Sequence, residues 1–259
     1  MAWTAFPYPE QAYVYDAASL EKAWPQLHLG DCEPFPQKAA LVDAWIAFHA
    51  GDFQRAAKLG LDVGVDGYTV AHKATCLYAN YLEPNETKKF ALFDEVAERC
   101  DRQQLEQPDN SAGYYWQAYA LGRYAQGISI VKALAQGIAP KIRHDLDKAI
   151  RLAPLHADAH IALGAYHAEI IRTVGAVIAT LTYGARKDDC YRAFRRGLEL
   201  DPDSAIGRIE YANAMLLLEG KKKADEAAEL VRQAAAFVPL DATERLDVEA
   251  AKQRLSREQ

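Results

Sequence analysis

Residues 151–158 read RLAPLHAD and residues 198–205 read LELDPDSA, and this pattern decides the fold. Residues 106–110 (EQPDN) and 237–242 (FVPLDA) repeat it more loosely. In each stretch a proline follows an amphipathic helical segment, and small or acidic residues that can cap a new helix come next. Four helix-ending signals of one kind predict a repeated helix–turn–helix unit.

The spacing of this unit is irregular. The intervals between Pro108, Pro154, Pro202 and Pro239 are 46, 48 and 37 residues, whereas a tetratricopeptide repeat (TPR) has about 34. The excess falls in two apolar, glycine-flanked segments, 127–139 and 173–185. Each follows the first helix of a hairpin, so we interpret it as an extension of that helix or as a short extra helix.

Small residues recur at corresponding places of the units. Ala118, Leu163-Gly164 and Ala212 lie where the two helices of a TPR hairpin cross, and a small side chain there permits close approach. The chain therefore resembles the TPR family. An earlier copy is visible in residues 51–57 (GDFQRAA).

A closer resemblance covers residues 111–239. It is carried by the aromatic run at 114–116 (YYW), the two insertions, IRHDLDKAIRLAP at 142–154 and LELDP at 198–202. This order resembles the regulator-of-microtubule-dynamics family and is similar to the TRAP transporter T-component family. The resemblance implies a helical repeat protein without catalytic residues. Members of the first family are adaptors at membranes and the cytoskeleton, and some are associated with lipid binding.

The predicted fold is all-α: a right-handed α-solenoid of TPR-like hairpins with two lengthened hairpins and a C-terminal capping helix. We expect a single TPR-like domain over 1–259. Its parts are an N-terminal arm at 1–18, early hairpins at 19–106, elongated repeats at 107–239 and a capping helix at 240–259. The expected helices are 19–28, 37–50, 52–64, 68–82, 86–106, 111–136, 140–152, 157–183, 187–199, 204–219, 222–237 and 242–256.

Composition excludes several classes of protein. Lys and Arg number 30 against 36 Asp and Glu, for a formal charge of −6, so a basic field for nucleic acid is not expected. The four cysteines (Cys32, Cys76, Cys100 and Cys190) are scattered and form no CxxC pair. No signal peptide and no transmembrane run is recognised. These observations predict a cytoplasmic protein.

The first helices of TPR hairpins line the concave face, and their inward positions predict an apolar and aromatic groove. The predicted groove residues are Trp45, Phe48, Tyr115, Tyr119, Ile161, Ala165, Ile209 and Asn213. A polar rim for a headgroup or carboxylate is predicted at Tyr114, Arg123, Arg172 and Tyr183.

Two interpretations of this groove stay open. In one, the insertions or the N-terminal arm fold into the groove and fill it with core. In the other, the insertions deepen it into a pocket for an acyl chain or an apolar peptide.

Signatures of catalysis and of cofactor binding are missing from the sequence. It contains no GxSxG, P-loop or dinucleotide fingerprint, and no HExxH accompanies His156, His160 and His167. We therefore expect no enzyme, no cofactor and no metal.

The predicted function is a non-catalytic binding module, or adaptor, that presents the groove to a protein or peptide. The alternative is a carrier for a lipid or other small apolar ligand held between the inserted segments. A homo-oligomer is a further expectation, because apolar insertions that do not close on themselves need a partner.

Overall fold

The computed structural model describes residues 3–128, 133 and 136–257, and the regular structure within these ranges is helical. Three short 3-10 helices are η1 (Gln11–Tyr13), η2 (Val65–Gly67) and η3 (Gly220–Lys223). The α-helices are α1 (Ala17–Leu27), α2 (Ala39–His49), α3 (Phe53–Val63), α4 (Tyr68–Tyr81), α5 (Glu86–Glu106), α6 (Ser111–Gly127), α8 (Ile138–Leu152), α9 (Ala157–Val174), α10 (Ala176–Tyr183), α11 (Lys187–Leu200), α12 (Ala205–Glu219), α13 (Ala224–Ala236) and α14 (Ala242–Arg257).

The proline turns connect the hairpins as the sequence predicts. Each turn is followed by a residue whose side chain accepts a hydrogen bond from the backbone of the next helix. These residues are Asn110 before α6, His156 before α9, Ser204 before α12 and Asp241 before α14. Such caps satisfy backbone N–H groups that have no partner within the helix. The repeated turn therefore ends one helix and begins the next.

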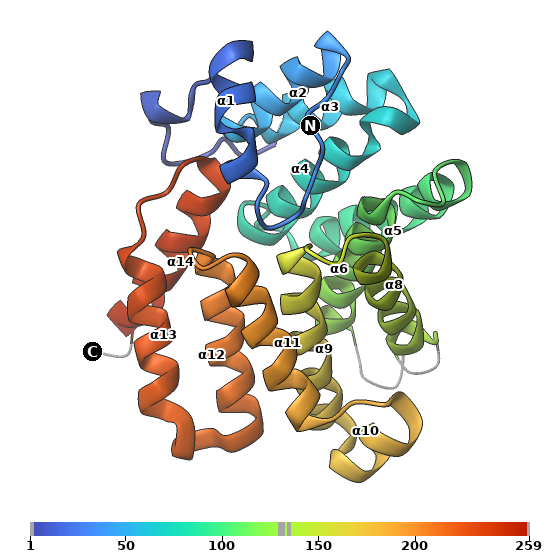
Figure 1. Cartoon of the computed structure of the whole chain (residues 1–259), viewed down its shortest axis with the longest axis vertical. Coiled ribbons are helices and arrows are strands. Elements are labelled where there is room, and N and C mark those ends of the chain that lie inside the picture. Colours follow the sequence, from blue (N-terminus) through green and yellow to red (C-terminus); the bar gives the residue numbers. More distant parts are fainter. Residues whose placement is uncertain (1–2, 129–132, 134–135, 258–259) are drawn as a thin grey trace.

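Successive hairpins stack into a TPR-like α-solenoid (Figure 1). The pairs are α2–α3, α4–α5, α6–α8, α9–α11 and α12–α13, and α14 packs on α13 as a last helix. No described helix is long and apolar enough to cross a membrane.

The second insertion is a separate short helix. Gly175 has a φ of +79°, which ends α9 at Val174, and α10 begins at the next residue. The uninterrupted helix expected over 157–183 is therefore wrong, and the short extra helix is the alternative that the structure supports. The helix expected over 111–136 ends at Gly127, and the remainder of the first insertion includes 129–132 and 134–135, which lie outside the described residues.

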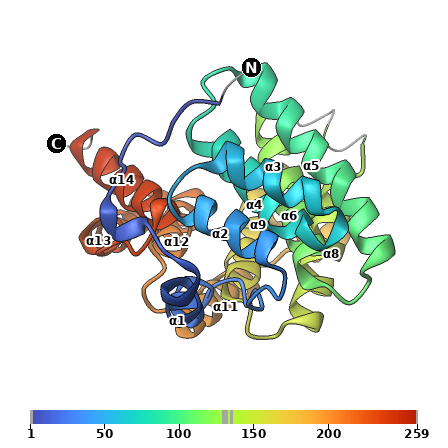
Figure 2. The same cartoon turned by 90° about the horizontal axis from the view of Figure 1, so that it is seen from above.

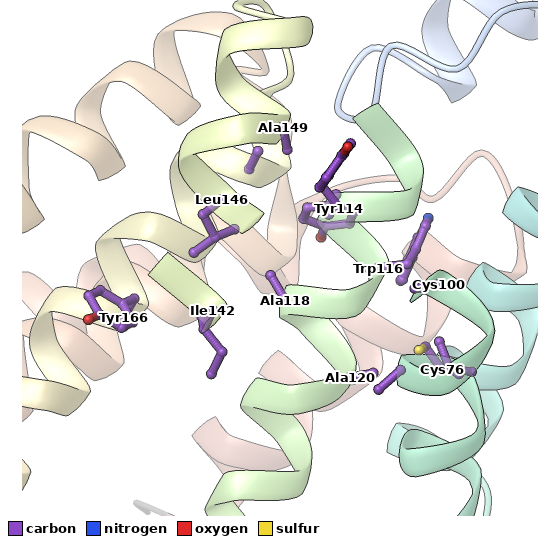
Figure 3. Packing of buried hydrophobic residues seen from close by; sticks show 14 of the residues in the cluster. Cys76, Cys100, Tyr114, Trp116, Ala118, Ala120, Ile142, Leu146, Ala149 and Tyr166 are labelled. Atoms are coloured by element: carbon purple, nitrogen blue, oxygen red, sulfur yellow. The ribbon is translucent and has the colours of Figure 1, made fainter. Parts of the chain in front are cut away.

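The largest hydrophobic cluster joins α4, α5, α6, α8 and α9. Figure 3 shows its middle, where Ala118 on α6 faces Ile142 and Leu146 on α8. Cys76 and Cys100 belong to the same cluster on the other side of α6. The long hairpins are therefore held together by continuous apolar packing from one repeat to the next.

The crossing of α9 and α11 depends on glycine. A Cβ at Gly164 would lie 2.6 Å from Cδ2 of Phe194, whose side chain is fully buried. Among the described residues, no heavy atom outside its own helix lies within 4 Å of a Cβ built at Gly122 on α6. These two helical glycines therefore differ in packing and not in secondary structure.

We predict that Gly164→Ala lowers the free energy of unfolding by about 1–3 kcal/mol, because Phe194 has to move within a packed core. Gly122→Ala is the matched control and raises it by roughly 0.5–1 kcal/mol, because alanine favours the helix. Urea denaturation followed by far-UV circular dichroism measures both. Equal stabilisation by the two substitutions would refute the crossing role of Gly164.

The N-terminal segment and α14 close the two ends of the solenoid on each other (Figures 1 and 2). The Tyr15 hydroxyl donates to the backbone oxygen of Leu240 at 2.9 Å, and Arg245 pairs with Glu10 at 2.6 Å. Nearer the N-terminus, Trp3 stacks on Tyr78 of α4 with 4.1 Å between ring centroids. The first and last parts of the chain thus share one interface.

Candidate functional site

The closed solenoid surrounds a central cavity of about 630 Å³ that is partly open to solvent. Its walls come from α4, α6, α8, α9, the start of α12, α14 and the loop after α1. The loop after α1 connects the α4 wall to the α9 wall through two contacts. Asp31 pairs with Lys73 of α4 at 2.6 Å, and the backbone oxygen of Gly30 accepts from the backbone N–H of Asp158 in α9 at 3.0 Å.

One part of the wall is apolar and aromatic. Tyr115, Trp116 and Tyr119 of α6 contribute ring surface. Aliphatic side chains of α8 and α9 continue it, and they include Ile142 and Ile170. This region lies beside the α6–α8 packing drawn in Figure 3.

The rest of the wall is acidic. Among the residues that the structure describes, nine carboxylate residues line the cavity against three basic ones, which are Lys73, Arg123 and Arg172. The acidic residues are Asp31, Asp158, Glu169, Asp201, Asp203, Glu210, Asp241, Glu244 and Asp247.

The three basic residues are each paired within the wall. Lys73 pairs with Asp31 at 2.6 Å, Arg123 with Glu210 at 2.9 Å and Arg172 with Glu169 at 2.9 Å. Burial opposes the charge of Lys73, but Asp31 outweighs burial and raises its pKa. The surplus carboxylates therefore have no basic residue of the described lining left to pair with.

A buried hydrogen-bonded chain joins the ends of the solenoid. His28 Nδ1 lies 2.8 Å from Asp31, His28 Nε2 lies 3.3 Å from His49 Nε2, and His49 Nδ1 lies 2.7 Å from Asp241. Each of these residues is less than one-tenth exposed. The chain connects the loop after α1, helix α2 and the turn before α14.

Both imidazoles lie between the two aspartates. Asp31 favours the charged form of His28, but burial outweighs it and lowers the pKa of His28 to about 4, so this ring is neutral near pH 7. Lys73 supplies a positive charge at the Asp31 end of the chain. Burial raises the pKa of Asp31, but His28 and Lys73 outweigh burial and hold it well below its usual range.

Burial raises the pKa of Asp201, and three further lining carboxylates have pKa values of about 7 or 8. Burial first, then Asp31, raises the pKa of Asp158 to about 7. Burial also raises the pKa of Asp247 to about 7, although the Tyr81 hydroxyl donates to this carboxylate. Burial and Asp241 raise the pKa of Glu244 to about 8. Near neutral pH the free cavity therefore holds carboxyl groups that resist ionisation.

The cavity contains part of the predicted groove. Tyr115, Tyr119, Ile161 and Ala165 line it, as do Arg123 and Arg172 from the predicted rim. The remaining predicted residues are Trp45, Phe48, Ile209, Asn213, Tyr114 and Tyr183, and they are not among the lining residues.

The residues outside the cavity have other contacts. Trp45 and Phe48 are buried in a hydrophobic cluster formed by the first hairpins, α1 and α14. There Trp24 of α1 packs edge to face on Trp45, with 5.4 Å between ring centroids. The groove of the first hairpin is thus covered by α1. Asn213 accepts from Arg254 at 2.7 Å, and the Tyr114 hydroxyl donates to the backbone oxygen of Pro108 at 3.1 Å.

Sequence reasoning missed the acidic wall and the histidine chain. Their members are separated by up to about 200 positions along the chain, so local spacing carries no signal for them. One local signal was available in α4, where His72 and Lys73 interrupt a run of buried apolar residues. A charged residue in such a run needs a buried partner. Within the described ranges no group of three His, Cys, Asp or Glu residues is arranged to hold a metal ion.

Comparisons with known proteins define the fold class. No protein-family model and no curated protein matches the chain. It is similar to TTC0263, described as a thermophilic TPR protein in Thermus thermophilus, with a TM-score of 0.57 and 18% identity over 83% of this chain and 97% of that one. MamA aligns with a TM-score of 0.44 and 14% identity, over 86% of this chain and 99% of MamA.

The likeness to TTC0263 shows that the chain is a TPR-like helical repeat protein, as the sequence predicts. The narrower resemblance to the regulator-of-microtubule-dynamics and TRAP transporter T-component families stays a prediction. The domain boundaries, the groove residues and the location in the cell also stay predictions.

The raised pKa of Asp158 gives a pH-dependent prediction. Folding favours the protonated carboxyl group of Asp158, because its pKa is about 7 in the folded protein and near 4 in the unfolded chain. The cost of Asp158 to the free energy of unfolding therefore grows as pH rises from about 4 to about 7. Asp158→Asn removes this cost. We expect the variant to gain roughly 2–3 kcal/mol of stability relative to wild type between pH 5 and pH 8.

Urea denaturation at both pH values measures this difference. Asp94→Asn on α5, which replaces an exposed aspartate away from the cavity, is the control for the substitution. A gap between Asp158→Asn and wild type that stays constant with pH would contradict the buried, protonated state of Asp158.

Proposed function

We propose that this protein is a non-catalytic binding module that encloses a short segment of a partner protein in its central cavity, and that this segment carries a basic side chain. The observation that carries the proposal is the part of the lining that the structure describes, where nine acidic residues face three basic ones and all three basic ones are paired. A lysine or arginine of the partner supplies the missing positive charge. The complementary charge makes ionised carboxylates favourable in a site where the free protein disfavours them.

The dimensions of the cavity support a short segment. A volume of about 630 Å³ lies in the range of pockets that enclose most of a drug-sized ligand, which corresponds to a few amino-acid residues. The aromatic wall of α6 accommodates an apolar neighbour of the basic side chain. The proposed segment therefore combines one basic residue with adjacent apolar residues.

A carrier of a small apolar ligand is the second candidate. Ile128, Ala133 and Ile138 of the first insertion line the apolar part of the cavity and favour this candidate. The second insertion contributes Thr173 to the lining, and no residue of α10 takes part. Such a ligand therefore contacts mainly the first insertion, and the acidic wall has no role in binding it.

Selection of peptides from a random heptapeptide display library tests the proposal. We expect peptides with a lysine or arginine beside apolar residues to be enriched. In fluorescence anisotropy with such a peptide, Asp158→Asn and Asp247→Asn each weaken binding about tenfold, because each removes a charge-assisted contact. Asp94→Asn leaves the affinity unchanged.

The sign of the pH effect separates charge recognition from apolar binding. Peptide affinity rises as pH increases from 6 to 8, because Asp158 and Asp247 ionise in this range and the bound cation favours their ionised forms. The proposal would be refuted if the enriched peptides lacked basic residues and bound wild type, Asp158→Asn and Asp247→Asn with equal affinity. A bound mass of a few hundred daltons in native mass spectra, lost on organic extraction, would favour the apolar carrier.

A further inference from the structure

A second hollow, the outer groove, lies on a different face of α9. It is lined by Arg143 of α8, by His160 and His167 of α9, and by several residues of α11, and its volume is about 520 Å³. Leu163 and Ala193 form an apolar part of its surface. The α9 residues at 160, 163 and 167 follow helical spacing on one face, whereas 158, 161 and 165 face the central cavity. The two hollows are therefore separate sites.

The charge of the outer groove is opposite to that of the whole chain. Arg143, Arg192, Arg195 and Arg196 line it together with two acidic residues, Asp189 and Glu199, so the formal charge is +2. The whole chain carries −6. This is a local reversal of charge in an acidic protein, and it attracts anions.

Arg143 pairs with Asp147 at 2.9 Å, whereas the three arginines of α11 are available to a ligand. Arg195 is exposed, and no described carboxylate lies within ion-pair distance of it. Arg192 and Arg196 pair with Asp189 and Glu199, at 3.1 and 3.5 Å, in solvent-exposed geometry. Exposed pairs of this kind contribute at most about 1 kcal/mol, so a doubly charged anion can replace the carboxylates.

A buried histidine adds an oriented donor to the groove. The ring of His167 is 1% exposed, and its Nδ1 accepts from the backbone N–H of Arg186 at 3.4 Å. Burial, reinforced by Arg143, lowers the pKa of His167 to about 4, so the ring is neutral at pH 7. A neutral ring with Nδ1 accepting carries its proton on Nε2. None of the described residues accepts a hydrogen bond from this N–H.

We propose that the outer groove binds a phosphate monoester group, with Arg192, Arg195 and Arg196 holding its oxygens and the Nε2–H of His167 donating from the groove. Guanidinium groups match the geometry of phosphate oxygens and form charge-assisted hydrogen bonds with them. The groove exceeds the size of one phosphate, so it also accommodates part of the organic group of the ester. This site is independent of the peptide site proposed for the central cavity.

Titration with inorganic phosphate, followed by NMR of the ¹⁵N-labelled histidine side chains, tests the proposal. At constant ionic strength and pH 7.5, we expect a saturable shift of the His167 Nε2–H resonance. Arg195→Gln weakens the phosphate affinity about tenfold, as expected for loss of a charge-assisted contact. Arg151→Gln, which replaces an exposed arginine of α8 outside the groove, leaves the affinity unchanged.

A second variant tests the contribution of the His167 N–H donor independently of the arginines. His167→Phe removes the N–H group and also weakens phosphate binding about tenfold, measured by the chemical shifts of backbone amides of α11. If this substitution of a buried residue prevents folding, the phosphate affinity of Arg195→Gln alone tests the proposal. Equal affinities for Arg195→Gln, Arg151→Gln and wild type overturn the proposal, and so does a His167 resonance that phosphate does not move.

Cosedimentation with vesicles distinguishes two sources of the phosphate group. Binding to phosphatidylcholine vesicles that contain phosphatidic acid, abolished in Arg195→Gln, assigns a lipid headgroup. Shifts with inorganic phosphate and no cosedimentation assign a water-soluble ester. If inorganic phosphate causes no shifts and the protein does not cosediment with the vesicles, the site is ruled out.

Discussion

The buried chain Asp31–His28–His49–Asp241 is the constraint on which the rest of the structure depends. A TPR-like solenoid is open by construction, because each repeat contacts only its neighbours. Here a polar chain joins the loop after α1 and helix α2 to the turn before α14. Because its groups are buried, the loss of any one partner leaves a polar group without compensation. Closure therefore has a strong energetic basis as well as apolar packing.

Closure converts a concave face into a cavity and defines its charge. Asp31 and Asp241 belong both to the closing chain and to the cavity wall. Burial opposes the ionised forms of both aspartates, but His28 and Lys73 lower the pKa of Asp31, and the hydrogen bond to His49 lowers that of Asp241. These structural carboxylates are therefore compensated within the protein. No described basic residue forms an ion pair with Asp158, Glu244 or Asp247, and burial raises their pKa values. The distinction between compensated and uncompensated carboxylates separates the part of the wall that maintains the fold from the part that is available to a ligand.

The sequence predicts the repeats because their signals are local. Proline turns, capping residues such as Ser204 and small crossing residues such as Gly164 act within one hairpin, and the structure confirms them. The interruption of α9 is also local, since Gly175 adopts a positive φ that other residues rarely adopt. The sequence left it open whether the second insertion extends α9 or forms a separate helix, because a glycine in a helical pattern permits both.

The closure and the acidic wall could not be predicted in this way. His49 and Asp241 lie 192 positions apart, and their contact depends on the accumulated curvature of every hairpin between them. For the same reason the predicted groove residues separate into two groups. Tyr115, Tyr119, Ile161 and Ala165 come from the middle repeats and face the cavity, whereas Trp45 and Phe48 of the first hairpin lie in the core near α1.

The distance between the first hairpin and the last helix tests closure most directly. Spin labels at Arg55→Cys on α3 and Gln253→Cys on α14, with the exposed Cys32 replaced by serine, report this distance by double electron–electron resonance. A closed solenoid predicts one narrow distance distribution that is the same in dilute and concentrated samples. A broad distribution extending to long distances would show that the ends separate in solution, and it would contradict the closure of the solenoid around the cavity.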